Sequence, residues 1–275
     1  MFEIDRIIRN ALQEDIGLGD ITTRATVAEG TVARAELVAK EDFVLAGLDV
    51  ARQVFAILDP AVAFEKLRED GQQVRRGEVF AWLKGDARAL LQGERVALNL
   101  LQRMCGVATL TARFVAAVEG SGAIIVDTRK TTPGLRVLEK YAVRTGGGRN
   151  HRTSLYDGVL IKENHSMAAG GIAVAIERAR KLAPHTLKIE VETRDLSEVE
   201  EAVKAGADII LLDNMDIETL TAAVDLIESR ALTEASGGVN LDTVAEIAAT
   251  GVNFISVGAL THSFRAVDIS MLFRQ

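Results

Sequence analysis

The segment from Asp127 to His165 contains the residues of this chain that are best suited to chemistry. It carries ten basic side chains against four acidic ones, while the whole chain of 275 residues has a formal net charge of -7. A basic cluster inside an acidic chain is typical of a site for a small polyanion. A surface for nucleic acid would normally belong to a basic domain.

The first cationic pair of this segment is Arg129-Lys130, directly after the apolar run 123–126. Arginine offers a planar fork to a carboxylate or phosphate, and lysine offers a point charge. The pair could therefore bind an anion. Alternatively, it could belong to the solvated first turn of a helix, with Thr132 as N-cap and Pro133 in the first turn. Cations oppose the helix dipole at that position, which favours a bound anion.

The second cationic pair, His151-Arg152, follows the glycines 146–148. Three glycines allow the backbone to approach a ligand closely, although such triplets are often only flexible loops. Lys162 ends the apolar run 158–161 and is either ion-paired or functional, a Schiff-base lysine included. We expect His165 to be a hydrogen-bonded loop histidine rather than a catalyst.

Acidic residues end two later apolar runs. Glu190 and Glu192 share one face because side chains of a strand alternate, and Asp213 ends the run 208–213. Carboxylates beside many cations suit Mg²⁺ held together with substrate phosphates, with Asp213 the strongest candidate. The alternative is that these acids are counterions for Lys162 and Arg152, and both interpretations can hold together.

Glycine-rich turns follow the last two apolar runs, at 236–238 and at Gly258. Such turns before helices present backbone N–H groups to phosphate, although they can also be ordinary tight connections.

The elements that must position these residues form two patterns. Before residue 120 the sequence indicates a small α+β domain with an antiparallel sheet. The elements that indicate it are a helix near the N-terminus, the loop 15–23, an alternating stretch over 31–47, helices over 49–58 and 89–118, and short strands between these helices. After residue 120, six apolar runs alternate with helical patterns, which indicates parallel strands covered by helices. Polar residues at the strand ends favour a reduced or irregular barrel.

Composition narrows the class of protein further. Apolar residues make up 48% and charged residues 26%, which fits a globular protein. No apolar run is long enough to cross a bilayer, and the charged N-terminal stretch is not typical of a signal peptide. The single cysteine, Cys105, cannot form an internal disulfide. We expect it to be structural and the protein to be cytoplasmic.

Long ordered motifs in both halves resemble the quinolinate phosphoribosyltransferase family. They read ALQEDIGLGDITT and LLQGERVALNLLQRMCGVAT before residue 110, and DTRKTTPGLR, GGGRNHR, LYDGVLIKENH, AGADIILLDN, EASGGV and SVGALTHS after it. The resemblance implies an α/β fold: an N-terminal α+β sandwich domain (1–107) followed by an incomplete, six- or seven-stranded α/β barrel (108–265). The segment 266–275 would return to the first domain.

The resemblance also implies an activity. Phosphoribosyl would pass from 5-phosphoribosyl 1-pyrophosphate (PRPP) to quinolinate, with Mg²⁺ as cofactor, giving nicotinate mononucleotide, CO₂ and pyrophosphate in NAD biosynthesis. The enzyme would be a homodimer, possibly a hexamer, in which Arg95 reaches the neighbouring subunit's site. No nucleic acid or membrane partner is expected.

The family's functional positions map onto this sequence residue by residue. The resemblance implies catalytic roles for Lys130, Lys162, Glu192 and Asp213, the last two also as Mg²⁺ ligands. It implies that substrates bind through Arg95, Thr128, Arg129, His151, Arg152, Lys162, Ser236, Gly237, Gly238 and Gly258. Cys105, where serine is expected, and Ser166, where the family is usually aliphatic, are small departures.

Three other functions fit parts of the pattern. One is the molybdenum-associated relative of the same fold, although the lysine of YDGVLIKENH argues against it. A second is a Schiff-base aldolase that uses Lys162. The third is a phosphate-ligand-binding barrel without turnover, which leaves a cationic cluster sized for a dicarboxylate unexplained.

Overall fold

The computed structural model describes residues 2–274 and divides them into two compact units. The first unit contains the residues up to Ala112, the segment Thr131–Gly147 and the residues from Ser263 onward. The second unit contains Arg113–Lys130 and Gly148–His262. The predicted domains 1–107 and 108–265 therefore differ from these units chiefly in the segment Thr131–Gly147, which groups with the first unit.

The first unit is built on a four-stranded antiparallel sheet in the order β12-β1-β5-β3. Its strands are β1 (Val32–Ala39), β3 (Ala63–Lys66), β5 (Val79–Asp86) and β12 (Ile269–Arg274), and a short pair is formed by β2 (Phe43–Val44) and β4 (Gln73–Val74). The helices that begin in this unit are α1 (Phe2–Ile16), α2 (Ile21–Thr26), α3 (Leu48–Leu58), α4 (Ala87–Ala117) and α5 (Arg136–Thr145). Since β12 pairs with β1, the C-terminal segment belongs to this sheet.

The core of the first unit lies between the sheet and its helices. Phe43 and Phe80 meet edge to face with ring centroids 5.9 Å apart, and both are fully buried. Cys105 on α4 is also fully buried, and its Sγ accepts from the N–H of Ala46 at 3.3 Å. Burial raises the pKa of this thiol, so Cys105 is structural, as predicted.

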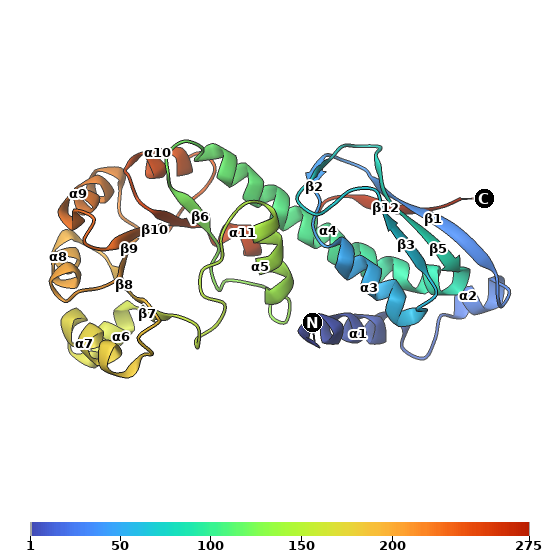
Figure 1. Cartoon of the computed structure of the whole chain (residues 1–275), viewed down its shortest axis with the longest axis horizontal. Helices are drawn as coiled ribbons and strands as arrows, with labels where there is room; N and C mark the ends of the chain where they lie inside the picture. The colour runs from blue at the N-terminus through green and yellow to red at the C-terminus, as the bar shows by residue number, and fades with distance from the viewer. Residues whose placement is uncertain (1, 275) are drawn as a thin grey trace. The chain divides into compact units, whose positions relative to one another are not determined.

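The second unit is a six-stranded parallel sheet in the order β6-β11-β10-β9-β8-β7. The strands are β6 (Ile124–Val126), β7 (Val159–Ile161), β8 (Ile189–Thr193), β9 (Ile209–Asp213), β10 (Leu232–Ser236) and β11 (Phe254–Ser256). The helices α7 (Ile172–Leu182), α8 (Leu196–Lys204), α9 (Ile217–Ile227) and α10 (Val244–Ala249) surround the strands (Figure 1). The predicted incomplete α/β barrel, following an N-terminal sheet domain, is confirmed.

The barrel is incomplete because β6 and β7, which follow each other in the chain, lie at opposite ends of the strand order. A single isolated parallel bridge pairs Val126 of β6 with Arg149. The buried carboxylate of Asp127 fixes the chain just beyond this bridge, because it accepts from the N–H of His151 at 2.8 Å and from Asn150 Nδ2 at 2.6 Å.

Two local interpretations of the sequence need correction. The loop 15–23 is interrupted by α2, whose N-cap Asp20 accepts from the N–H of Thr23 at 2.9 Å. Thr132 is not an N-cap, because α5 begins at Arg136. Instead Thr132 Oγ1 accepts from Arg103, and its N–H donates to Glu139 at 3.0 Å.

Among the described residues, no helix is long and apolar enough to cross a membrane.

Candidate active site

Strand periodicity determines which side chains enter the barrel interior. Leu211 aligns with Glu192 on β8 and with Glu234 on β10, and Asp213 aligns with Ser236 two residues further along. Because strand side chains alternate, these residues lie on one face in successive layers. The upper layer lies at the carboxyl ends of the strands, where ligands bind in α/β barrels.

A cavity of about 280 Å³ lies at this end of the second unit. It is lined by Thr128, Arg129, Lys130, His151, Arg152, Leu160, Lys162, Glu192, Leu211, Asp213, Glu234, Ser236 and Ser256. The structure therefore brings together nine of the side chains predicted for the site. They come from loops and strand ends spread over about half of the chain.

The cationic side chains of this cavity come from two strand ends and from the loop between them. Arg129 and Lys130 follow β6, Arg152 follows the glycine loop, and Lys162 follows β7. Arg152 Nη1 donates to the carbonyl of Gly158 at 3.0 Å. Burial, and then the positive charge of Arg129, lower the pKa of the Arg152 guanidinium. Two guanidinium groups that repel each other in a partly buried cavity form a site that an anion would stabilise.

The acidic side chains have defined partners. Glu192 Oε2 lies 2.8 Å from Lys162 Nζ, so the predicted ion pair is present. Asp213 Oδ2 accepts from Asn214 Nδ2 at 2.8 Å. Glu192 and Asp213 project from neighbouring strands into one cavity and offer only oxygen atoms, a donor set that fits Mg²⁺. A Schiff base needs an amine that is free to attack a carbonyl, and in this structure the amine of Lys162 is engaged by Glu192.

The glycine turns flank the same end of the barrel. A side chain at Gly237 would collide with Asn214, since a Cβ there would lie 2.5 Å from Asn214 Cγ. Gly258 approaches Lys130 and His262 closely, because a Cβ there would lie 3.2 Å from Lys130 Cδ and 3.0 Å from His262 Nε2. Only Ser236 of these turn residues lines the cavity itself, so phosphate binding at Gly237, Gly238 and Gly258 remains a prediction.

The predicted site residue Arg95 and the loop histidine expected at His165 do not line the cavity. Arg95 lies in the first unit, on the exposed side of α4, and is not among the residues that line the cavity. His165 is hydrogen-bonded as expected, since its Nδ1 accepts from the N–H of Lys162 at 2.9 Å. It lies in the helix α6 (Glu163–Ala169), however, and not in a loop.

Sequence reasoning missed Glu234 and Ser256 in this cavity. Both precede a predicted phosphate-site residue by two positions, Ser236 in one case and Gly258 in the other. The alternation of strand side chains therefore predicts that Glu234 faces inward with Ser236. Glu190 was considered with Glu192 as a metal ligand, but its carboxylate contacts His151 instead, at 2.9 Å.

The open parallel barrel and its cationic, carboxylate-containing cavity define a class: an enzyme domain that binds small anionic substrates at the strand ends. Two family models specify it further. Residues 20–105 match the quinolinate phosphoribosyl transferase N-terminal domain, and residues 107–272 match the C-terminal domain. The chain belongs to the quinolinate phosphoribosyltransferase family.

Individual relatives agree with this assignment. A probable nicotinate-nucleotide pyrophosphorylase (carboxylating) of Bacillus subtilis is 45% identical over 98% of this chain and 93% of its own length. The structure of the nicotinate-nucleotide pyrophosphorylase from Francisella tularensis has a TM-score of 0.95 and 40% identity, covering 99% of this chain and 96% of that one. The structure of NadC from Streptococcus pyogenes also has a TM-score of 0.95, with 41% identity, covering 100% and 98%.

Proposed function

We propose that the cavity of the second unit transfers phosphoribosyl from PRPP to quinolinate with decarboxylation. The products are nicotinate mononucleotide, CO₂ and pyrophosphate, and the chain is a pentosyltransferase of NAD biosynthesis. The observation that carries the proposal is the meeting of Arg129, Lys130, Arg152 and Lys162 with Glu192 and Asp213 in one cavity at the strand ends. Membership of the family, over both halves of the chain, supports the same reaction.

Quinolinate carries two neighbouring carboxylates, and the cavity has two arginines to receive them. Arg129 and Arg152 can each bind a carboxylate through two N–H groups, which fixes both the position and the orientation of the pyridine ring. The ring nitrogen must face the anomeric carbon of PRPP for the new bond to form. Orientation of this kind is worth ~7–11 kcal/mol in well-aligned intramolecular reactions.

PRPP would lie on the other side of the cavity. The turns at Ser236–Gly238 and Gly258 would receive its 5-phosphate through backbone N–H groups. Glu192 and Asp213 would hold Mg²⁺, which when bound neutralises charge on the pyrophosphate leaving group. The same two carboxylates stabilise positive charge that develops at the anomeric carbon as the bond to pyrophosphate lengthens.

Transfer leaves the ring nitrogen positively charged. The bond from C2 to its carboxylate then breaks, CO₂ leaves, and the electron pair remains on C2 beside that positive nitrogen. A proton must reach C2 to complete the product. Lys130 and Lys162 both line the cavity, and the amine of either can supply this proton.

The oligomeric state and the role of Arg95 belong to the same proposal. Arg95 is exposed on α4 and is not among the described residues that line the cavity of the second unit. We place it in the site of a partner subunit, in a homodimer or a hexamer built from dimers. The buried, reduced Cys105 supports a cytoplasmic location.

One assay tests the proposed function. The purified protein is incubated with quinolinate, PRPP and Mg²⁺, and nicotinate mononucleotide is measured together with quinolinate consumption. Stoichiometric product is the expected result. Binding of PRPP without any product would support a phosphate-binding barrel instead, and a borohydride-trapped adduct on Lys162 would support the aldolase.

A further inference from the structure

A single buried side chain, that of Asp127, connects the two chain segments that carry the arginines of the substrate cavity. Asp127 follows β6 directly and lies two positions before Arg129. Its carboxylate accepts hydrogen bonds from the other segment, which carries Arg152. Asp127 is fully buried and is not among the described residues that line the cavity. Any influence of Asp127 on a substrate must therefore pass through its neighbours.

The backbone pairing beside Asp127 is interrupted by its own side chain. The N–H of Arg149 donates to the carbonyl of Ile125 at 2.9 Å, and the N–H of Asp127 donates to the carbonyl of Arg149 at 3.2 Å. In a regular parallel ladder the next hydrogen bond would run from the N–H of His151 to the carbonyl of Asp127. Here the carboxylate of Asp127 accepts this N–H instead, through Oδ1 at 2.8 Å.

This exchange of acceptors changes the spacing of the two segments. Strands joined by a regular ladder lie ~4.8 Å apart. The side chain of Asp127 places two carbon atoms between Cα and the acceptor oxygen, where a backbone carbonyl places one. Its second oxygen, Oδ2, accepts from Asn150 Nδ2 at 2.6 Å, so the carboxylate holds this segment at two points. The length of the Asp127 side chain therefore determines how far apart the segments lie after β6.

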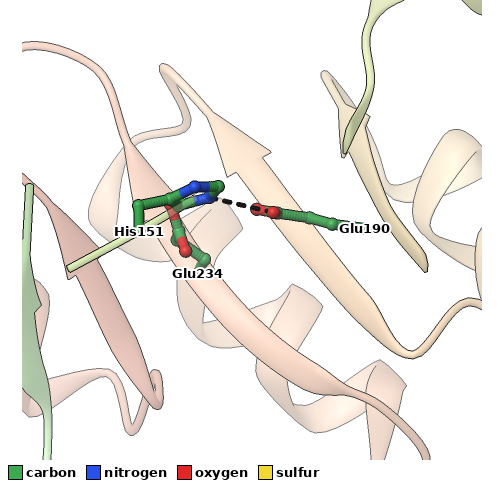
Figure 2. Close-up of side chains that lie close together, drawn as sticks. All are labelled: His151, Glu190 and Glu234. Atoms are coloured by element: carbon green, nitrogen blue, oxygen red, sulfur yellow. Dashed lines mark ion pairs between the residues drawn. The ribbon is translucent and has the colours of Figure 1, made fainter. Parts of the chain in front are cut away.

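His151 passes this position on to Arg152. The N–H of Arg152 donates to His151 Nδ1 at 2.7 Å, and His151 Nε2 lies 2.9 Å from Glu190 Oε2. Figure 2 shows the ring of His151 facing Glu190 and Glu234, which project from β8 and β10. The backbone of His151 is thus held by Asp127 and its ring by a strand of the barrel, and this ring in turn holds the backbone N–H of Arg152.

We propose that Asp127 is a positioning residue that sets the distance between the guanidinium groups of Arg129 and Arg152, and thereby the preference of the cavity for two adjacent carboxylates over one. Arg129 is joined to Asp127 through one intervening residue, and Arg152 through the hydrogen bonds of His151. If this distance changed, the cavity would still attract one carboxylate, but the two arginines could no longer bind a pair of carboxylates together. The inference rests on the proposed function, because it assumes that these arginines bind quinolinate.

The length and the charge of this side chain can be varied separately. Asp127→Asn keeps the length and removes the charge, and the amide of Asn150 can turn to accept from the new N–H group. Asp127→Glu keeps the charge and adds one methylene, whereas Asp127→Ala removes both acceptor oxygens. For each variant, titration calorimetry without PRPP gives the dissociation constants of quinolinate and of nicotinate, which has one carboxylate fewer. The quantity compared is the ratio of Kd for nicotinate to Kd for quinolinate.

The wild type should bind quinolinate more tightly than nicotinate by roughly tenfold or more, the value of one further hydrogen-bonded charge pair. Asp127→Glu and Asp127→Ala should lower this ratio roughly tenfold, mainly through weaker binding of quinolinate. Asp127→Asn should keep the ratio within about threefold of the wild type, because the acceptor for the His151 N–H stays in place. Asn150→Ala is the matched control, since it removes the hydrogen bond to Oδ2 and leaves the one from His151 intact.

The outcomes separate positioning from charge and from simple packing. A lower ratio in Asp127→Asn with an unchanged ratio in Asp127→Glu would show that the charge matters and the length does not, which would overturn the proposal. Equal weakening of both ligands in a folded Asp127→Ala variant would reduce Asp127 to a structural role. Circular dichroism and thermal unfolding identify variants that do not fold. If Asp127→Glu and Asp127→Ala are among them, a lower ratio in Asp127→Asn still overturns the proposal.

Failure of this inference can be told apart from failure of the proposed function. A wild type that binds nicotinate as tightly as quinolinate would overturn the inference, whatever its activity. A wild type that prefers quinolinate but forms no nicotinate mononucleotide with PRPP and Mg²⁺ would refute the proposed reaction, while the variants of Asp127 would still decide how a dicarboxylate is selected.

Discussion

Replacing Gly237 by alanine should disturb Asp213 through the side chain of Asn214. A Cβ at Gly237 would lie 2.5 Å from Asn214 Cγ and even closer to Oδ1. The N–H of Asn214 donates to the carbonyl of Ser236 at 2.8 Å, so its backbone is anchored and the side chain must move. That movement breaks the hydrogen bond from Asn214 Nδ2 to Asp213 Oδ2.

The size of the effect follows from two separate costs. Gly237 has a φ of +98°, and forcing an alanine into such a conformation costs ~1–3 kcal/mol of stability. A hydrogen bond to a charged group is worth ~1.5–3 kcal/mol, which corresponds to a loss of roughly ten- to a hundredfold in kcat/KM if Asp213 must be oriented for catalysis.

Gly238→Ala is the matched control. Gly238 also has a positive φ, +63°, but a Cβ there meets no atom within 4 Å. Gly237→Ala should therefore lose more stability than Gly238→Ala in urea unfolding, while both change the turn that we assign to the 5-phosphate. Only Gly237→Ala should in addition shift the curve of activity against Mg²⁺ concentration, measured by titrating Mg²⁺ at saturating substrates.

Two results would refute this reasoning. Full activity of Gly237→Ala would mean that Asn214 can move without consequence for Asp213. The same Mg²⁺ titration curve in both variants would show that the contact with Asn214 adds nothing to the change in the turn.

Other substitutions test separate parts of the molecule. Lys162→Ala should nearly abolish turnover while circular dichroism stays native, and full activity would remove this lysine from the site. Arg95→Ala should be inactive alone but regain activity in mixed dimers with a site-dead partner, whereas no rescue would argue against a shared site. Because burial raises the pKa of the Cys105 thiol, its stabilising effect is complete below the unfolded value near pH ~8.5 and falls by ~1.4 kcal/mol per pH unit above it. Urea unfolding of Cys105→Ala should accordingly be less dependent on pH in that range. Gly106→Ala should lower stability by ~1–3 kcal/mol despite the better helix propensity of alanine. A Cβ there would lie 3.0 Å from Phe264 and closer still to the carbonyl oxygen of Arg265, and an unfolding midpoint at or above that of the wild type would contradict this.

The parallel strands of the second unit could be predicted because a buried strand is indicated by its own residues, without knowledge of its partners. Each is a short apolar run that ends in a polar residue, as in the run that ends at Asp213 and the run that ends at Ser236. The positions of the rim residues follow from this, because the carboxyl ends of parallel strands lie at one edge. This is why nine predicted residues line one cavity.

Features that depend on distant partners could not be predicted in this way. Thr132 has the local appearance of an N-cap, but Arg103 and Glu139 bind it, and α5 starts four residues later. His151 has the local appearance of a cation beside Arg152, but its Nε2 contacts Glu190 at 2.9 Å, a residue 39 positions along the chain. Local sequence specifies which residue types are present, and their state depends on contacts that only the fold provides.

The charges of the cavity together explain how it could distinguish quinolinate from a pyridine with one carboxylate. The positive charge of Lys162 is paired with the carboxylate of Glu192, so it does not require an anionic ligand for compensation. Burial, and then the charge of Arg129, lower the pKa of the Arg152 guanidinium, while the charges of Glu190 and Asp157 act in the opposite direction. A dicarboxylate can bring a negative charge to each of the two guanidinium groups, whereas a monocarboxylate can do so for only one of them. Selectivity would then come from this repulsion within the enzyme, because it makes the second carboxylate of the substrate necessary and not merely helpful.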